Sequence, residues 1–538
     1  MKAGGDALTD ELSDFRKVAA SGMIFIAGGQ AIKLFVHVGS IIVLSRLLGP
    51  ADFGIFAMVS PVLALFAIIR DGGLTSAVLQ RKSISDAELT SLFWISISWG
   101  VGLGVLLALA APLIARFYGE PRLVNLVYAS SAIVIAGSLS LQHMTLLNRA
   151  LRFRTLAAID AGSLAFGYVI AAIIALLMPS YWALWAANAT TAGVICAAAW
   201  IACRWRPGAP RRTSGVGDML RTGGSVTISG LFDFLIRSVD TALIGHFRGS
   251  FELGLYNRAY RIVLLPLIFV SAPLDRLILP SLVRMRDHPE RYCKVYRLAL
   301  QAPLLAILPA MVTIAAMPET VCRLLLGSGW AEAAPLLAWL SLAGALQLVT
   351  SSLGSLLISQ GRASELTALN AASLVLACVA FSIGTPYGAL GVAAAYATSE
   401  IIRAPAAICW ATRKGPLRAH DVLVTVLPFL LSALCSYAAL FWVGQRLANG
   451  LLSLVISTIL SYSIALLGLL VTETGREGLN EAIKAARDIA APLGLLGEHG
   501  PLRRHVAAFF GSRSGGRHEQ EQEGVHEAQP IEKPVGRG

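Results

Sequence analysis

Residues 45–56 read SRLLGPADFGIF, and 200 residues later residues 245–256 read GHFRGSFELGLY. The aligned stretches agree at three positions: Gly49 with Gly249, Gly54 with Gly254, and Phe56 with Tyr256. A single match of this kind arises easily among apolar residues, so its weight depends on whether other parts of the chain repeat with the same spacing.

Two further pairs of stretches repeat in the same order and with nearly the same offset. Residues 156–164 (LAAIDAGSL) correspond to residues 366–374 (LTALNAASL), and residues 181–184 (YWAL) correspond to residues 387–390 (YGAL). Three matches in order are unlike chance. The sequence therefore predicts a chain built from two similar halves.

Long apolar runs occupy almost the whole chain. Hydrophobic residues make up 56% of the sequence, charged residues only 14%, and the mean hydropathy is +0.67. A helix of about 20 apolar residues crosses the hydrocarbon core of a bilayer, and only internally hydrogen-bonded segments are tolerated there. We expect about fourteen spans, at residues 19–45, 53–79, 89–115, 124–147, 156–178, 182–203, 222–246, 255–282, 298–318, 333–359, 365–384, 388–410, 421–444 and 450–472.

The repeat and the runs together predict the fold class and the division of the chain. We expect an all-α integral membrane protein with two six-helix lobes related by pseudo-two-fold symmetry, followed by two additional C-terminal helices. Because each half has an even number of spans, the symmetry axis runs along the membrane normal. The predicted parts are a cytoplasmic N-terminal segment (1–18), an N-terminal lobe (19–203), a cytoplasmic linker (204–221), a C-terminal lobe (222–410), two further helices (421–472) and a partly disordered cytoplasmic tail (473–538).

Charge and cysteine usage set the orientation and exclude several classes of function. The net charge of +12 comes mainly from Arg and Lys in short loops, where they set orientation, so it does not indicate nucleic-acid binding. Their bias places both termini in the cytoplasm. The seven cysteines show no metal-ligand spacing, and no Walker A or HExxH motif is present, so we expect no metal, no cofactor and no enzyme activity.

Ionisable residues inside spans are the candidates for function, because each costs roughly 2.5–3.5 kcal/mol at a helix centre. The seventh span carries Asp233, Arg237 and Asp240, whose spacing puts them on one helical face. An offset of 200 residues leads back to a matching stripe on the first span: Lys33, His37 and Ser40. We expect both stripes to line a central cavity. A closed ion-pair lock without a ligand remains the alternative.

Six further residues are weaker candidates for the cavity. Asp71 and Asp275 occupy similar places late in the second and eighth spans. Arg258 and Arg261 lie near the start of the eighth span, where they either line the cavity or extend to the membrane surface. Glu400 and Arg403 are three residues apart on the twelfth span, so they form either part of the lining or an internal ion pair.

Three stretches resemble signatures of one transporter family: residues 253–261 (LGLYNRAYR), 47–59 (LLGPADFGIFAMV) and 73–82 (GLTSAVLQRK). With the duplicated layout, they resemble Wzx-type flippases of the polysaccharide transport family. That family belongs to the MOP superfamily, together with MATE carriers and the lipid II flippase. The resemblance covers about residues 15–472.

The resemblance implies a carrier of the bacterial inner membrane. It would move an undecaprenyl-diphosphate-linked oligosaccharide from the cytoplasmic to the periplasmic leaflet, for exopolysaccharide or lipopolysaccharide synthesis. Alternating access would be driven by an ion gradient, with a proton or sodium as coupling ion, and a polymerase and export machinery are possible partners. On charge grounds, Lys33, Arg237, Arg258 and Arg261 are candidates for the diphosphate.

Two other functions stay open at this stage. A MATE-like multidrug or cation antiporter would favour a net acidic lining, whereas the two stripes are mixed and rather basic. A membrane enzyme, such as a polysaccharide polymerase or glycosyltransferase, would need a large periplasmic loop or a soluble catalytic domain, and the loops of this chain are short.

Overall fold

The computed structural model describes residues 28–81, 84–210, 238–444 and 450–471, together with residues 227, 231, 234, 475 and 476. These residues form helices and short connections, without a strand. The first described helix covers Gly28–Leu47. It is followed by α2 (Pro50–Asp71), α3 (Leu74–Gln80), α4 (Asp86–Tyr118), α5 (Leu123–Arg149), α6 (Phe153–Leu177), α7 (Trp182–Ala202), α9 (Val239–Arg284), α10 (Pro289–Ala316), α11 (Pro318–Leu325), η1 (Ser328–Ala333), α12 (Ala334–Ser359), α13 (Ala363–Gly384), η2 (Thr385–Tyr387), α14 (Gly388–Thr412), α15 (Ala419–Gly444) and α16 (Leu451–Val471).

The all-helical membrane fold predicted from the sequence is confirmed. Twelve segments of the described residues are long and apolar enough to cross a membrane, and one of them, Ala363–Thr412, contains two of the predicted spans. Most of the predicted span at 222–246 lies outside the described residues, as do the predicted N-terminal segment and nearly all of the tail. The arrangement of six, six and two spans therefore stays a prediction.

Glycines break the helices at two places, one within a predicted span and one between two predicted spans. The span expected at 53–79 is divided, because Gly72 and Gly73 adopt φ values of 53° and 68° and end α2 before α3 begins. The break between the seventh and eighth spans, predicted between residues 246 and 255, lies at Gly249 within α9, where the backbone leaves the helical conformation (φ 80°, ψ −172°). Glycine accepts such positive φ values without the steric cost that other residues incur.

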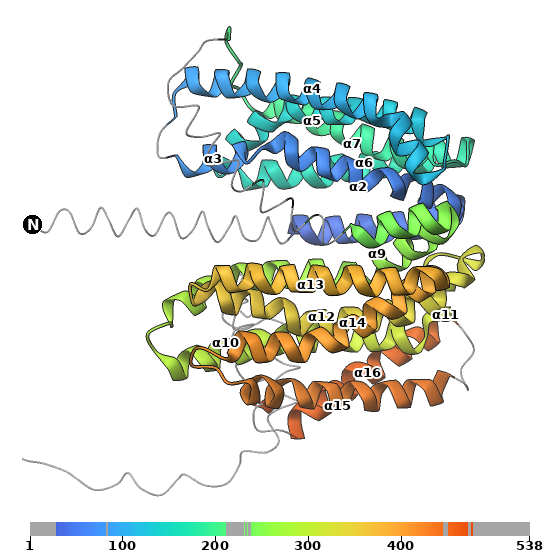
Figure 1. The fold of residues 1–538 in the computed structure, drawn as a ribbon, viewed down its shortest axis with the longest axis vertical. Helices are drawn as coiled ribbons and strands as arrows, with labels where there is room; N and C mark the ends of the chain where they lie inside the picture. Colours follow the sequence, from blue (N-terminus) through green and yellow to red (C-terminus); the bar gives the residue numbers. More distant parts are fainter. Residues whose placement is uncertain are drawn as a thin grey trace, which may run out of the picture. The chain divides into compact units, whose positions relative to one another are not determined.

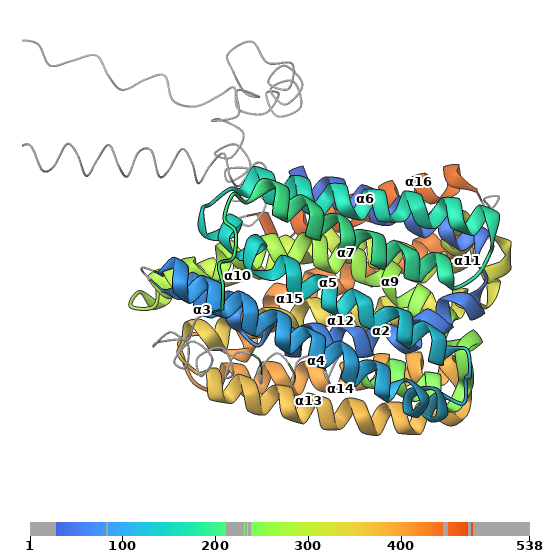
Figure 2. The same ribbon diagram turned by 90° about the horizontal axis from the view of Figure 1, so that it is seen from above.

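The helices form two groups that lie side by side. Figure 1 shows α2 and α4–α7 in one group and α10 and α12–α16 in the other, with α9 between them. In the view at right angles, the long helices of both groups run in nearly the same direction (Figure 2). We call the helix Gly28–Leu47 with α2–α7 the N lobe, and α9–α14 the C lobe. Helices α15 and α16 pack against α10.

The repeat is visible at the start of the last helix of each lobe. In the N lobe, the carboxylate of Asp52 accepts a hydrogen bond from the backbone N–H of Tyr181 at 3.0 Å, just before α7. In the C lobe, Glu252 accepts one from the N–H of Ala389 at 2.7 Å, in the first turn of α14. A carboxylate at a helix N-terminus satisfies a free N–H group and complements the helix dipole. Both lobes thus use the acidic residue of the repeated motif in the same way.

An arginine binds the C-terminal end of α7 in the N lobe and of α14 in the C lobe. Each arginine follows a turn with a positive φ angle. Arg152 donates to the carbonyl of Ala202 at the end of α7 (2.9 Å), and Arg362 donates to the carbonyl of Ala411 near the end of α14 (2.7 Å). The residue before each arginine has a positive φ, 53° at Leu151 and 74° at Gly361. A cation at the C-terminus of a helix binds carbonyl groups that have no partner within the helix.

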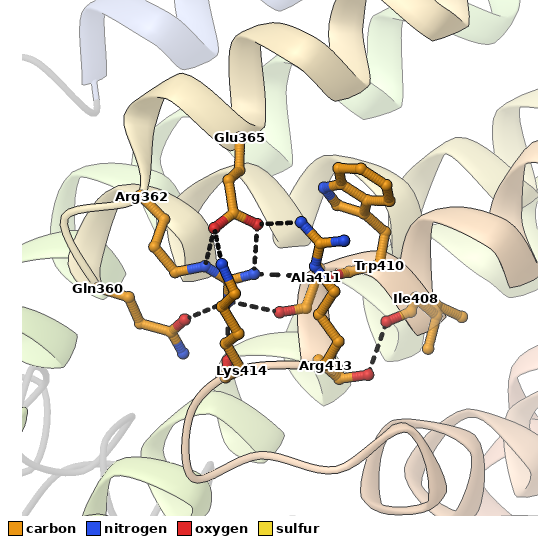
Figure 3. A network of polar contacts seen from close by, with 9 residues as sticks. Gln360, Arg362, Glu365, Ile408, Trp410, Ala411, Arg413 and Lys414 are labelled. Carbon is orange, nitrogen blue, oxygen red and sulfur yellow. Dashed lines mark hydrogen bonds and ion pairs between the residues drawn. The ribbon is translucent and has the colours of Figure 1, made fainter.

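In the C lobe this arginine belongs to a larger polar network (Figure 3). The carboxylate of Glu365 in α13 accepts hydrogen bonds from Arg362, Arg413 and Lys414. Arg362 directly precedes α13, and Arg413 and Lys414 directly follow α14. The guanidinium of Arg413 also lies over the ring of Trp410, 3.6 Å from its centre. The network therefore fixes the start of α13 to the end of α14.

The two lobes meet where α2 and α9 cross, at the end of the molecule where α2 begins (Figure 1). A Cβ atom on Gly54 would overlap the backbone of Ser250, and one on Gly254 would overlap the backbone of Pro50. The matching glycines of the repeat are therefore the residues that let the two lobes touch through their backbones.

The turn between α5 and α6 generates a first prediction. We expect Leu151→Gly to raise the free energy of unfolding by about 1 kcal/mol, because a positive φ is strained for leucine and this side chain is 46% exposed. The matched change Gly361→Ala should lower it by a similar amount. Unfolding in detergent, followed by tryptophan fluorescence, measures both. Equal stability of the two variants and the wild type would contradict this interpretation.

The crossing of the lobes generates a second prediction. Gly54→Ala should destabilise the protein by about 1–3 kcal/mol, because the added methyl group forces α2 and α9 apart. Gly102→Ala in α4 is the control, since nothing lies within 4 Å of its added Cβ, and alanine should slightly stabilise that helix. The thermal midpoints of both variants test this. The account fails if Gly54→Ala is as well tolerated as Gly102→Ala.

Candidate functional site

Arg258, which the sequence made a cavity candidate, is buried between the lobes. Its guanidinium donates to the hydroxyl of Ser45 (2.7 Å) and to the carbonyl of Ile41 (3.1 Å), both on the helix Gly28–Leu47. It also lies over the ring of Phe53, 4.1 Å from the ring centre. Only 5% of Arg258 is exposed. One of the two sequence interpretations had the side chain extend to the membrane surface, and the structure shows that it does not.

Trp330 completes this contact from the C lobe. Its indole N–H donates to the carbonyl of Ser45 at 2.7 Å, and its ring meets Phe53 edge-on at 5.4 Å. We call Ser45, Phe53, Arg258 and Trp330 the inter-lobe cluster. All four are buried. The cluster holds a positive charge that is satisfied by neutral oxygens and an aromatic face, so it couples the lobes without a carboxylate among the contacts described above.

A group of basic residues lies along the helix Gly28–Leu47 and beside it. Lys33 forms an ion pair with Asp160 of α6 at 2.8 Å, and both side chains are partly exposed. His37 lies between the lobes, with its Nδ1 atom 3.4 Å from the hydroxyl of Tyr168 in the N lobe and its ring 6.2 Å from Phe269 in α9.

Arg261 of α9 belongs to the same region. The charges of Arg261 and Lys33 both act on the His37 ring, and Arg261 is exposed. We call Lys33, His37 and Arg261 the basic cluster. Ser40, one turn after His37, instead donates to the carbonyl of His37 at 2.8 Å and is buried. Lys33 and His37 of the first stripe therefore lie in the basic cluster, whereas the hydroxyl of Ser40 bonds to the backbone of its own helix.

Asp160 was not among the residues selected from the sequence. It stands at the position that corresponds to Asn370 in the aligned stretches 156–164 and 366–374, so the repeat held a signal for it. The ion pair with Asp160 gives Lys33 a partner from within the N lobe, which was not predicted from the sequence. The closed lock proposed for Asp233 and Arg237 is untested, because both lie outside the described residues.

The C lobe contains a polar cavity of about 310 Å³ between α9, α12, α13 and α14. Three predicted residues line it: Asp240, Glu400 and Arg403. Its other polar lining residues, which sequence reasoning missed, are Tyr260, Gln347, Thr350, Ser351, Asn370, Ser373, Tyr396 and Ser399. Gln347 and Glu400 stand near the middle of α12 and α14, so the cavity lies at the middle of the helices.

The charged residues of this cavity are held in place by neighbours. Glu400 and Arg403 form an ion pair at 2.6 Å, and Arg403 also donates to the hydroxyl of Thr350 at 2.8 Å. The carboxylate of Asp240 accepts from the hydroxyl of Tyr256 at 2.8 Å and from the N–H of Thr241 at 2.6 Å. The internal pair and the lining role, which the sequence left as alternatives for Glu400 and Arg403, are therefore both present.

Two remaining candidates lie elsewhere. Asp71 is the last residue of α2, and its carboxylate accepts from the hydroxyl of Thr75 in α3, so it bridges the break at Gly72 and Gly73. Asp275 lies within α9, but its side chain is outside the described residues. In the part of the chain that the structure describes, no three His, Cys, Asp or Glu side chains are placed to hold a metal ion.

Curated relatives are proteins of bacterial polysaccharide synthesis. The teichuronic acid biosynthesis protein TuaB of Bacillus subtilis is 28% identical over 301 residues, which are 55% of this chain and 62% of that protein. The lipopolysaccharide biosynthesis protein WzxC of Escherichia coli is 24% identical over 395 residues, 72% of this chain and 79% of that protein. The chain thus spans about three fifths of TuaB and about four fifths of WzxC.

Solved structures show the same fold at low sequence identity. The lipid II flippase MurJ in an inward closed conformation has a TM-score of 0.67 with 13% identity, over 83% of this chain and 97% of that one. An inward-facing multidrug resistance MATE transporter of the MOP superfamily has a TM-score of 0.54 with 17% identity, over 71% of this chain and 93% of that one. At such identities these comparisons concern the fold alone.

A family model described as "Polysaccharide biosynthesis protein" matches residues 43–335. The matched region contains both copies of the repeated motif, the inter-lobe cluster and Arg261. Because the match covers more than half of the 538 residues, the chain belongs to this family of polysaccharide biosynthesis proteins.

Proposed function

We propose that this multi-pass membrane protein is a flippase, not an enzyme, and that it moves an undecaprenyl-diphosphate-linked oligosaccharide between membrane leaflets. The observation that carries the proposal is the basic cluster on the facing helices of two lobes that touch through their backbones at one end. Family membership, relatives such as the succinoglycan biosynthesis transport protein ExoT of Rhizobium meliloti, and the MurJ-like fold support it.

The positions of the charges suit a lipid-linked diphosphate. A bare phosphate charge is very costly in hydrocarbon unless it is paired or hydrated. Arg261 in the C lobe and Lys33 in the N lobe lie near enough to His37 for their charges to act on its ring, and Asp160 partly offsets the charge of Lys33. A diphosphate between the lobes would meet cations from both sides, while its lipid tail stays in the bilayer.

The inter-lobe cluster supports an alternating-access cycle. The end of the molecule at Gly54 and Gly254 is closed by backbone contact and by Arg258. To open this end, the protein must break the bonds from Arg258 and Trp330 to Ser45. We therefore assign Arg258 to the closure of this end, instead of the diphosphate contact that the sequence had suggested.

The remaining parts of the proposal follow from the resemblance and from the charge bias. We propose the bacterial inner membrane as location, cytoplasmic termini, and a proton or sodium gradient as the energy source. A polymerase and an export complex are the proposed protein partners, since a flipped repeat unit must be joined and exported.

A MATE-like multidrug or cation antiporter is the second candidate, supported by the likeness to the MATE fold. Such a carrier is expected to attract cations into the space between its lobes. The basic cluster disfavours this function, because Lys33 and Arg261 would repel a cation there.

Export of glycan in cells tests the proposal. We expect deletion of the gene to abolish export of the strain's polysaccharide, and the wild-type gene to restore it. Arg261→Glu should fail to restore it, because an acid would repel the diphosphate. Arg116→Glu is the control, since Arg116 is an exposed arginine in the last turn of α4. Unchanged export in the deletion strain, or full export with Arg261→Glu, would contradict the proposal.

The role of Arg258 can be tested separately by thiol labelling. Phe53→Cys should react slowly with a membrane-impermeant maleimide applied to cells, because position 53 is buried in the inter-lobe cluster. Adding Arg258→Ala should increase the labelling rate about tenfold or more, since closure then lacks its buried hydrogen bonds. The protein without Phe53→Cys supplies the background from native cysteines. Equal labelling with and without Arg258→Ala would exclude a closing role.

A further inference from the structure

The charge of the described residues that line the C-lobe cavity differs in sign from that of the basic cluster. These lining residues carry two carboxylates, Asp240 and Glu400, and one guanidinium, Arg403. The formal charge of this lining is therefore −1. The two other charged residues of the predicted stripe, Asp233 and Arg237, lie outside the described residues. A diphosphate is thus repelled from this cavity, whereas a neutral or cationic group is not.

Two amides in the cavity are available for a ligand. The side-chain amides of Gln347 in α12 and Asn370 in α13 form no hydrogen bond within the described residues, and both residues line the cavity. A side-chain amide offers two donors and one acceptor. Gln347 is partly buried and Asn370 is exposed, so the amide groups of both are accessible to a polar ligand in the cavity.

The hydroxyl groups of the cavity are oriented in a way that leaves acceptors exposed. Thr350, Ser351 and Ser373 each donate to a backbone carbonyl of their own helix. Thr350 also accepts a hydrogen bond from Arg403, whereas the lone pairs of Ser351 and Ser373 remain available to accept from a ligand. Tyr260 and Tyr396 add two aromatic side chains to the same space. A ligand with many hydroxyl donors and an apolar ring face fits this set of groups.

The size of the cavity also selects among ligands. A volume of about 310 Å³ corresponds to about ten water molecules, which is at the lower end of small-molecule sites. A bare cation would fill a small part of it, and a whole oligosaccharide would not fit. A single sugar residue has a matching size.

We propose that the C-lobe cavity is a subsite for one neutral or amino-substituted sugar of the cargo, and that it rejects sugars with a carboxylate. This inference rests on the proposed function, because it assigns two parts of the proposed lipid-linked cargo to two different sites. The diphosphate lies at the basic cluster, and a sugar enters the cavity, where Gln347 and Asn370 bind its hydroxyl groups and Asp240 and Glu400 exclude an anion.

Binding of three matched sugars to the full chain in nanodiscs tests the subsite. Saturation-transfer NMR compares glucose, glucosamine and glucuronate, which differ mainly in charge. We expect glucose and glucosamine to bind, and glucuronate to bind about tenfold or more weakly, because its charge meets the carboxylates. Equal binding of glucuronate and glucose would overturn the proposed selectivity without the need for any variant.

Two variants locate the binding within the molecule. Gln347→Leu and Asn370→Leu should each weaken glucose binding about three- to tenfold, because each removes hydrogen bonds at similar volume. Asn188→Leu is the matched control, since Asn188 is an exposed amide of α7 in the N lobe and bonds to its own helix. Binding that is the same in Gln347→Leu, Asn370→Leu and Asn188→Leu would overturn the subsite.

The export assay separates this inference from the proposed function. If the wild-type gene restores export but glucose binds equally to wild type and to both cavity variants, the subsite is wrong and the flippase proposal stands. If glucose binds as expected but deletion leaves export unchanged, the subsite stands and the flippase proposal is wrong.

Discussion

At Gly54 and Gly254 the backbones of α2 and α9 approach so closely that a methyl group on either residue would overlap the other helix. This contact determines where the two lobes meet, and the other features of the inter-lobe surface depend on it. It brings Arg258 within reach of Ser45 and Phe53, and it places α9 beside the helix that carries His37. A bulkier residue at the crossing would separate these groups. The structure thus depends on two residues that have no side chain.

The distribution of charge around this crossing separates three tasks within one protein. A buried cation joins the lobes at one end, the partly exposed basic cluster lies between the lobes, and a cavity whose described lining has a formal charge of −1 lies within the C lobe. Each arrangement is costly inside a membrane unless it has partners or water. The ion pairs Lys33–Asp160 and Glu400–Arg403 lower that cost without removing the polarity of either surface.

The sequence predicted the repeat, the helical membrane fold and several residues of the polar surfaces, because these features depend on spacing along one helix. Glu400 and Arg403 are an example, since a separation of three residues places them together on any helix. The partners that come from distant helices were not predictable in this way. Asp160 and Trp330 act through contacts across 127 and 285 residues of sequence, which only the tertiary packing brings about. Asn370 of α13 and Gln347 of α12 line one cavity because the packing places these two helices around it. The break at Gly72 escaped prediction because the apolar pattern continues through it, whereas the break at Gly249 coincides with the gap predicted between the spans at 222–246 and 255–282.

The most direct measurement of the central claim is the movement of a lipid-linked oligosaccharide across a vesicle membrane that contains only this protein. Purified full-length protein in liposomes, with a labelled undecaprenyl-diphosphate glycan and an imposed proton or sodium gradient, allows the fraction of glycan exposed on each side to be followed with time. The account predicts transfer that is fast compared with empty liposomes and that is lost with Arg261→Glu. A transfer rate equal to that of empty liposomes, under either gradient, would contradict it.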